Sequence, residues 1–138
     1  MLVLLLASIL LAYVAPTTSV RIPFSGLLAA LFLVIGLGFS AAGFLTFKQS
    51  GTPVRPGSEP SQLVLKGPYR ITRNPMYLGL LLFSLGFLFA AKSLWFILPP
   101  IFFFLVINFR LIPFEEELLR NRFGPAYDSY RRQVRRWL

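Results

Sequence analysis

The stretch Ile22–Phe47, IPFSGLLAALFLVIGLGFSAAGFLTF, contains no charged side chain in 26 consecutive residues. An α-helix of this length would be about 39 Å long, at about 1.5 Å per residue. About 20 apolar residues are enough to cross a hydrocarbon core that is about 30 Å thick. The stretch therefore predicts a membrane-spanning helix, and the rest of the chain is interpreted around it.

Three other apolar runs accompany this stretch, so we expect four spans, at about residues 1–15, 22–47, 76–91 and 94–112. The first run is short, but it lacks the preceding cations and the cleavage site of a signal peptide. Only Lys92-Ser93 separates the last two runs, which predicts a tight antiparallel hairpin. Pro99-Pro100 predicts a kink or break in the fourth span, near the middle of the membrane.

The composition supports the same class of protein. Hydrophobic residues make up 56% of the 138 residues and charged residues only 14%, yet the net charge is +9. A disordered chain would be less hydrophobic, and a nucleic-acid-binding domain would be basic without being so apolar. We therefore expect one all-α integral membrane domain over residues 1–138. Because Cys and His are absent, a Cys/His metal site cannot be built, and no metal is expected.

The cations are concentrated in two segments. Twelve of the 14 Lys and Arg residues lie between Lys48 and Arg73 or from Arg110 onward, and the other two are Arg21 and Lys92. The positive-inside rule then places both termini, the loop 48–75 and the tail 113–138 in the cytosol, at a prokaryotic cytoplasmic membrane. The two polar segments therefore meet on one side of the membrane, where a site can be assembled.

Small residues recur in the second and third spans. Gly36, Ser40 and Gly43 lie near helical spacing, and Gly79 and Gly86 mark the third span. In lipid, such residues let two helices pack closely. The Gly-rich stretch at 36–41 also resembles a dinucleotide fingerprint, but no strand precedes it and no acidic residue follows at the required distance.

The loop ends in the sequence Lys66–Gly79, KGPYRITRNPMYLG. Asn74 and Pro75 are typical of the first residues of a helix, so one interpretation is purely structural. In that interpretation the arginines of this stretch bind lipid phosphates and its tyrosines belong to an aromatic belt at the membrane surface. The alternative is that these polar side chains form a binding site.

The tail begins with Arg110–Leu119, RLIPFEEELL, which holds three consecutive carboxylates. Acidic residues after a proline are also favourable at a helix N-terminus. Three adjacent carboxylates repel one another and raise at least one pKa unless cations neutralise them. If the loop and the tail pack together, we expect Arg110, Arg70 and Arg73 to be these cations.

The last stretch, Ala126–Trp137, predicts an interfacial amphipathic helix. Its aromatic and apolar residues fall on one helical face, namely Tyr127, Tyr130, Val134 and Trp137. Its other positions are rich in arginine, namely Arg131, Arg132, Arg135 and Arg136. We interpret this pattern as an anchor whose basic face binds anionic headgroups.

Four short motifs occur in order, with two apolar spans between the second and the third: Gly67-Pro68-Tyr69-Arg70, Arg73-Asn74-Pro75-Met76-Tyr77-Leu78-Gly79, Glu115-Glu116-x-x-Leu119 and Phe123-Gly124-x-x-Tyr127-x-x-Tyr130. This pattern resembles the isoprenylcysteine carboxyl methyltransferase family, and the related phospholipid N-methyltransferases share much of it. The resemblance covers roughly residues 22–138. Asn74 stands where the isoprenylcysteine family usually has His; it keeps a hydrogen-bonding side chain but does not titrate near neutral pH.

The resemblance implies a membrane-embedded methyltransferase that uses S-adenosyl-methionine and acts on a lipidic or isoprenoid carboxylate or amine. The implied catalytic residues are Arg110, Glu115 and Glu116. The implied cofactor-binding residues are Tyr69, Arg70, Arg73, Asn74, Pro75, Tyr77, Gly79 and Glu116. Arg can hold a carboxylate in bidentate fashion, while Glu can neutralise a positive charge or take a proton from an amine.

Two other functions compete with this one. The first is a non-enzymatic small membrane protein that binds anionic lipid or a partner through its basic tail. The second is a reductase of the related sterol-reductase lineage, which is disfavoured because the chain is short and lacks an evident place for a dinucleotide. For the methyltransferase and for the non-enzymatic membrane protein alike, the expected partners include membrane lipid.

Overall fold

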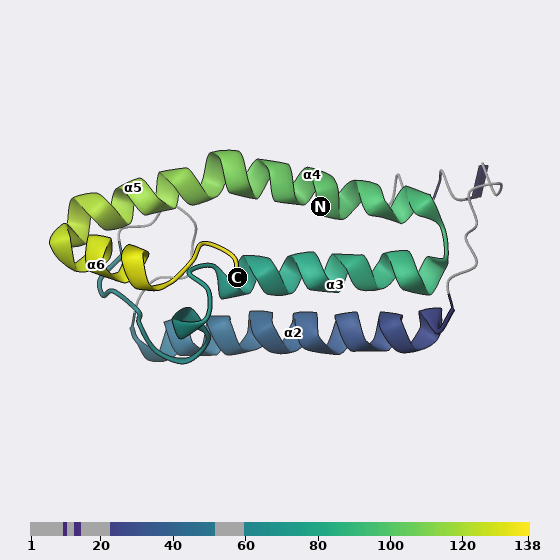
Figure 1. The fold of residues 1–138 in the computed structure, drawn as a ribbon, viewed down its shortest axis with the longest axis horizontal. Helices are drawn as coiled ribbons and strands as arrows, with labels where there is room; N and C mark the ends of the chain where they lie inside the picture. Colours follow the sequence, from purple (N-terminus) through teal and green to yellow (C-terminus); the bar gives the residue numbers. More distant parts are fainter. Residues whose placement is uncertain (1–9, 11–12, 15–22, 52–59) are drawn as a thin grey trace.

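The computed structural model describes residues 10, 13–14, 23–51 and 60–138, and within these residues every regular element is a helix (Figure 1). The elements are α2 (Ser25–Gln49), η2 (Gly67–Arg70), α3 (Pro75–Ala91), η3 (Leu94–Ile97), α4 (Leu98–Val106), η4 (Ile107–Leu111), α5 (Ile112–Phe123) and α6 (Pro125–Gln133). This confirms the predicted all-α class. The predicted first span, 1–15, lies outside the described residues apart from positions 10, 13 and 14.

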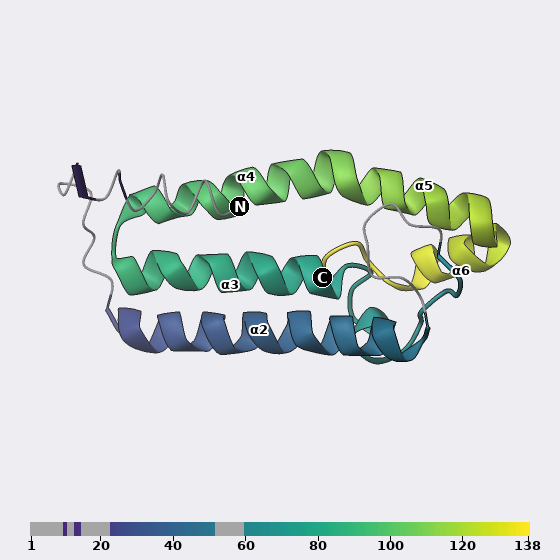
Figure 2. The ribbon, with the colours of Figure 1, turned by 180° about the vertical axis from the view of Figure 1, so that it is seen from behind.

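The helices form a three-membered antiparallel array. The elements from η3 to α5 run on as one helix of 30 residues, Leu94–Phe123. In both Figure 1 and Figure 2, α3 lies between α2 on one side and this long helix on the other. The short helix α6 folds back at the far end of α5, so the polar segments gather at one end of the array.

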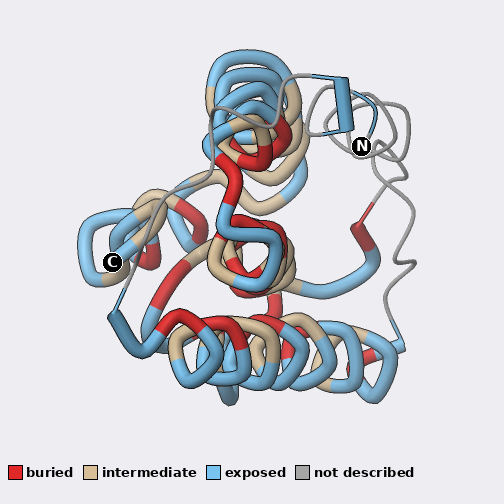
Figure 3. Tube along the Cα trace, turned by 90° about the vertical axis from the view of Figure 1, so that its right-hand side faces the viewer, coloured by how far each residue is buried: buried red, intermediate tan, exposed pale blue. Residues whose placement is uncertain are grey.

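Two helices in the described part of the chain, Ser25–Gln49 and Leu94–Phe123, are long and apolar enough to cross a membrane. The third, α3, is also apolar but has only 17 residues. Many large apolar side chains point outward from these helices, among them Leu31, Val34, Leu37, Ile101, Phe102 and Leu105. Figure 3 shows the buried positions facing neighbouring helices and the exposed positions facing away. Such an apolar outer surface suits contact with lipid.

The helices α2 and α3 touch through the small residues noted in the sequence. A Cβ atom added at Gly79 would lie 2.5 Å from the backbone nitrogen of Ser40 and 2.6 Å from the carbonyl oxygen of Gly36. The hydroxyl of Ser40 also donates a 2.9 Å hydrogen bond to the carbonyl oxygen of Met76. The prediction of close packing between the second and third spans is therefore confirmed.

We expect Gly79→Ala to destabilise the fold, because its new methyl group meets backbone atoms that cannot rotate away. Overpacking of this kind costs about 1–3 kcal/mol. Gly38→Ala is the matched control: nothing lies within 4 Å of its added Cβ, and a helical Gly→Ala change there gains about 0.5–1 kcal/mol. Thermal unfolding in detergent measures both. Equal midpoints for the two variants would contradict the close contact.

The connection between α3 and α4 is the predicted tight hairpin. Lys92 ends α3 in the left-handed conformation, with φ 52°, and the 3₁₀ turn η3 follows at once. The prediction that Pro99-Pro100 interrupts the fourth span near its middle is wrong. Both prolines lie in the first turn of α4, where a missing backbone N–H removes no helical hydrogen bond.

The helix of the fourth predicted span continues beyond residue 112, although Pro113 and the following acids suggested the start of a new helix. The helix passes through the π-helical turn η4 and continues as α5 to Phe123, with Pro113 in the first turn of α5. Because proline cannot donate a helical hydrogen bond, the helix can continue only where the preceding turn adjusts to it. The carboxylates therefore lie on a helix that is continuous with the apolar helix α4.

The last helix is shorter and oriented differently from the prediction. α6 ends at Gln133, and Val134 is extended, so the predicted helix to Trp137 is wrong over its last four residues. Tyr127 and Tyr130 are buried, with 1% and 8% of their surface exposed. Their face therefore packs on the protein, and they do not form the predicted stripe toward the membrane.

Candidate functional site

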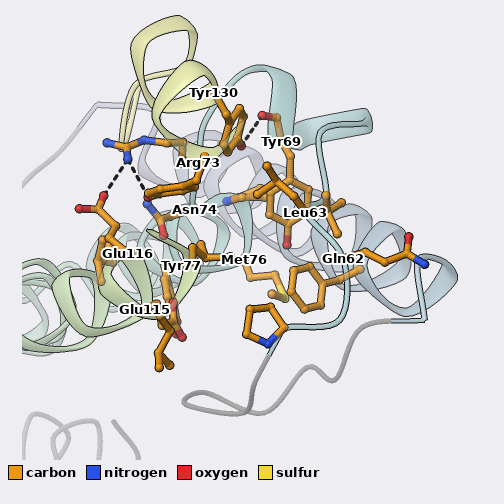
Figure 4. A pocket seen from close by; sticks show the side chains of 18 residues that line it. Gln62, Leu63, Tyr69, Arg73, Asn74, Met76, Tyr77, Glu115, Glu116 and Tyr130 are labelled. Carbon is orange, nitrogen blue, oxygen red and sulfur yellow. Dashed lines mark hydrogen bonds and ion pairs between the residues drawn. The ribbon is translucent and has the colours of Figure 1, made fainter. Parts of the chain in front are cut away.

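A cavity of about 120 Å³ lies where the loop, the start of α3, α5 and α6 meet (Figure 4). Its polar lining includes Arg73, Glu115 and Glu116. The rest of its wall is largely apolar or aromatic and comes from Phe47, Leu63, Val64, Tyr69, Met76, Leu118, Leu119 and Tyr130. The cavity thus combines a few charged groups with an apolar surround, as small-molecule sites commonly do.

Glu116 is held by two arginines. Its Oε1 atom lies 2.9 Å from Nη1 of Arg73. Arg136 binds both carboxylate oxygens, with Nε at 3.1 Å from Oε1 and Nη2 at 2.8 Å from Oε2. Parallel bonds of this kind fix the orientation of a carboxylate as well as its charge. The cations that neutralise Glu116 are therefore Arg73 and Arg136.

Arg73 keeps a buried donor without a partner. Its Nη1 atom bonds the hydroxyl of Tyr127 at 3.0 Å as well as Glu116, and its side chain is only 10% exposed. Its Nε atom is buried and has no hydrogen-bond partner. Because a buried unpaired donor is costly, this atom is a candidate donor to a ligand with acceptor oxygens.

Glu115 has a different environment from its neighbour. Its Oε1 atom accepts a 2.8 Å hydrogen bond from the hydroxyl of Tyr77, and no ion pair to it is found within the described residues. It lies on α5, beyond the apolar run that ends at Phe109. Burial raises the pKa of the Glu115 carboxyl, and the bond from Tyr77 opposes that rise. Glu115 is therefore the carboxylate in this cavity that can meet a positive charge from a ligand.

Two tyrosines join the loop to its neighbours. Tyr130 donates a 2.7 Å hydrogen bond to the carbonyl oxygen of Tyr69, and the ring of Tyr69 lies 5.8 Å from that of Phe47. Burial raises the pKa of both phenols, so their hydroxyls remain protonated. These contacts fasten the loop, α2 and α6 together around the cavity.

Asn74 precedes α3 but does not cap it with its side chain. Its amide nitrogen donates instead to the carbonyl oxygen of Arg136, at 2.9 Å. The hydroxyl of Thr72 donates to the same oxygen at 3.0 Å, and the backbone nitrogen of Arg73 donates to the carbonyl oxygen of Arg135 at 2.9 Å. The extended residues after α6 are thus paired with the loop beside the cavity.

The structure brings most of the predicted site residues together. Those lining the cavity are Tyr69, Arg73, Asn74, Pro75, Tyr77, Glu115 and Glu116. Three others lie elsewhere: Arg70 and Arg110 are exposed and line no part of it, and Gly79 is buried against α2. The prediction of Arg70 and Arg110 as counter-ions is therefore not supported, because Arg136 takes that position on Glu116.

Sequence reasoning missed Arg136, Tyr127 and Tyr130 as parts of the site. All three lie in the stretch that was interpreted as a lipid anchor. Their helical periodicity correctly placed the two tyrosines on one face, but periodicity alone does not say whether that face meets lipid or protein. The spacing of the two tyrosines within the last motif was the available signal.

A family model described as phospholipid methyltransferase matches residues 24–126, and the chain belongs to this family. An uncharacterized protein of Haemophilus influenzae (strain ATCC 51907 / DSM 11121 / KW20 / Rd) is 48% identical over 65 residues, which are 46% of this chain and 100% of that protein. No solved structure matches the chain. The family confirms the predicted relationship to isoprenylcysteine and phospholipid methyltransferases, and it indicates a membrane methyltransferase with lipid-like substrates.

Proposed function

We propose that this protein transfers a methyl group from S-adenosyl-methionine to a lipidic acceptor, at the cytosolic surface of the membrane. The observation that carries the proposal is the buried, unpartnered Nε atom of Arg73, a residue that lines the same cavity as Glu115, in a chain of the phospholipid methyltransferase family. The exposed arginines at this end, such as Arg70, Arg131 and Arg132, support a cytosolic orientation.

The residues of the cavity fit the chemical groups of S-adenosyl-methionine. Arg73 Nε would hold the carboxylate of its methionine part, because a guanidinium binds carboxylates well and this donor has no other partner. Glu115 would face positive charge, and the aromatic and apolar wall that includes Tyr69 and Met76 would contact its adenosine. When bound, the cofactor supplies a methyl group on a sulfonium, which is open to in-line displacement.

The protein's own part in this reaction is to bind, orient and exclude water. Holding donor and acceptor in line can lower the barrier by about 7–11 kcal/mol. Tyr77 holds the carboxylate of Glu115 in place, and the raised pKa of that carboxyl makes it a better proton acceptor than an exposed Glu. Apolar residues such as Leu118 and Leu119 limit access of water to the cavity.

Of the two acceptor classes, an amine-bearing lipid suits the site better than a carboxylate. Glu115 has no ion-pair partner among the described residues, so it would repel an acidic acceptor and attract an ammonium group. Glu115 would then take the proton that the amine loses. The lipid tail would remain among the apolar helices.

The experiment is methyl transfer from S-adenosyl-methionine labelled in its methyl group to lipid vesicles. One set contains phosphatidylethanolamine and the other contains a prenylated cysteine, both with the same neutral lipid background. Label in the amine lipid is the expected result. Base-labile label in the prenylated cysteine alone would overturn the choice of acceptor, and no transfer by a protein that unfolds cooperatively would overturn the proposed activity.

The rate of this transfer should depend on pH through Glu115. Burial raises the pKa of its carboxyl, so on acidification activity is lost at a higher pH than protonation of an exposed Glu would require. Tyr77→Phe removes the hydrogen bond that favours the ionised form, which raises this pKa further. Rate profiles should therefore show the acid limb at higher pH in Tyr77→Phe than in the wild type; an unmoved limb would argue against Glu115 as the titrating group.

A further inference from the structure

The residues after α6 form part of the cavity's support. Arg135–Trp137, which we call the clasp, pairs with the loop through the two carbonyl oxygens that accept from Arg73, Thr72 and Asn74. The guanidinium of Arg136 reaches Glu116 from this backbone. The contacts between the clasp and the loop join positions that are more than 60 residues apart in the sequence.

A second contact holds the clasp from the long helix. Oδ1 of Asn108 accepts from the indole Nε1 of Trp137 at 3.0 Å and from Nη1 of Arg136 at 3.4 Å. Asn108 lies in the π-helical turn η4, and the indole also packs against Phe104 with ring centres 5.4 Å apart. π-helical turns are frequent at functional positions, and this one presents its side chain to the clasp.

The arrangement around Glu116 explains why Arg73 retains an unused donor. Two cations share one carboxylate, and Arg136 occupies both of its oxygens. Arg73 contacts Glu116 through Nη1 only, and its Nε remains unpartnered. Without Arg136, the same carboxylate would be free to move to the other edge of the Arg73 guanidinium and pair in parallel with Nε and Nη2, a geometry that arginine favours.

We propose that Arg136 is a positioning residue. By binding both carboxylate oxygens of Glu116, it keeps the Nε atom of Arg73 available for an anionic group of the bound ligand. This inference rests on the proposed function for the identity of that ligand. This positioning role replaces the lipid-anchoring role that the sequence pattern suggested for Arg136. The half-exposed side chain of Arg136, at 32%, is directed at a carboxylate of the protein.

The test compares the affinity for S-adenosyl-homocysteine, measured by calorimetry in uncharged detergent, among matched variants. Arg136→Gln should bind at least about tenfold more weakly, because one charge-assisted contact of this kind is worth that much. Arg132→Gln removes the same charge from an exposed position of α6 and should bind like the wild type. Arg136→Lys should recover little, since an ammonium cannot bond both oxygens in parallel.

To test whether Arg136 acts through Glu116, the Arg136→Gln substitution is repeated in the Glu116→Gln variant. Once Glu116→Gln has removed the carboxylate, the additional loss from Arg136→Gln should largely disappear. Wild-type affinity in Arg136→Gln, an equal loss in Arg132→Gln, or an undiminished loss in the Glu116→Gln background would each overturn the proposal. If Arg136→Gln does not fold, Asn108→Ala decides, because it loosens the clasp without changing any charge and should also weaken binding.

Failure of the proposed function would look different. In that case the wild type binds no S-adenosyl-homocysteine at all, and hydrogen exchange at the backbone amide of Arg73 still tests the clasp. Slow exchange in the wild type and faster exchange in Arg136→Gln would support the contact. Rapid exchange in the wild type would overturn it.

Discussion

Replacing Glu115 by Gln is expected to lower methyl transfer by about 100-fold or more. The change keeps the shape of the side chain and its hydrogen bond with Tyr77, but it removes the negative charge that faces the cavity without an ion-pair partner among the described residues. Initial rates with labelled S-adenosyl-methionine and amine-lipid vesicles measure the loss. Because a partly buried charge without an ion-pair partner is costly to the fold, the thermal midpoint should stay the same or rise.

Glu117→Gln is the control for this variant. It lies two residues further along α5, is exposed and does not line the cavity, so its rate should match the wild type. Equal losses in the two variants would indicate an effect of net charge, and an unchanged rate in Glu115→Gln would remove this residue from the proposed site.

Arg73→Gln is expected to weaken binding of S-adenosyl-homocysteine by about 100-fold, since the charge-assisted hydrogen bond from Nε to a ligand carboxylate and the positive charge of the arginine would both be lost. Arg73→Lys is the sharper variant. It keeps a cation close to Glu116 but has no atom equivalent to Nε, the unpartnered donor, so it should also bind weakly. Calorimetry measures both, with thermal unfolding as the check that each variant folds.

The control is Arg70→Gln. This arginine lies in the preceding turn, carries the same charge and is exposed outside the cavity. Its affinity should equal that of the wild type. Wild-type affinity in Arg73→Lys would show that the positive charge suffices and that the Nε atom has no particular role.

The sequence was sufficient for the apolar helices and for the way two of them touch. A run as long and as free of charge as Ile22–Phe47 is compatible with few structures other than an apolar helix. The glycines at helical spacing predicted the contact between α2 and α3. The sequence was misleading about Pro113, where it suggested that a new helix begins. Pro113 follows an apolar run and precedes acids, which are the usual signs of a new helix, but a π-helical turn lets the helix continue.

The sequence motifs identified the site's carboxylates and Arg73, but not Arg136, the second cation that binds Glu116. Which arginine reaches Glu116 depends on where the chain turns after Gln133, and side-chain periodicity carries no information about that. Arg110 lies only six residues before Glu116, yet it is exposed, while Arg136 arrives from a distant segment. Charge complementarity predicted that a cation would be present, and only tertiary packing identified it.

The most direct test of the account is photo-crosslinking of S-adenosyl-methionine, labelled in its methyl group, to the purified protein, followed by mapping of the labelled peptide. We expect label within residues 69–77 or 115–130, the two segments that contain most of the residues lining the cavity, and loss of that label when S-adenosyl-homocysteine is in excess. Label confined to the outward-facing apolar part of α2, or label that the competitor does not remove, would contradict it.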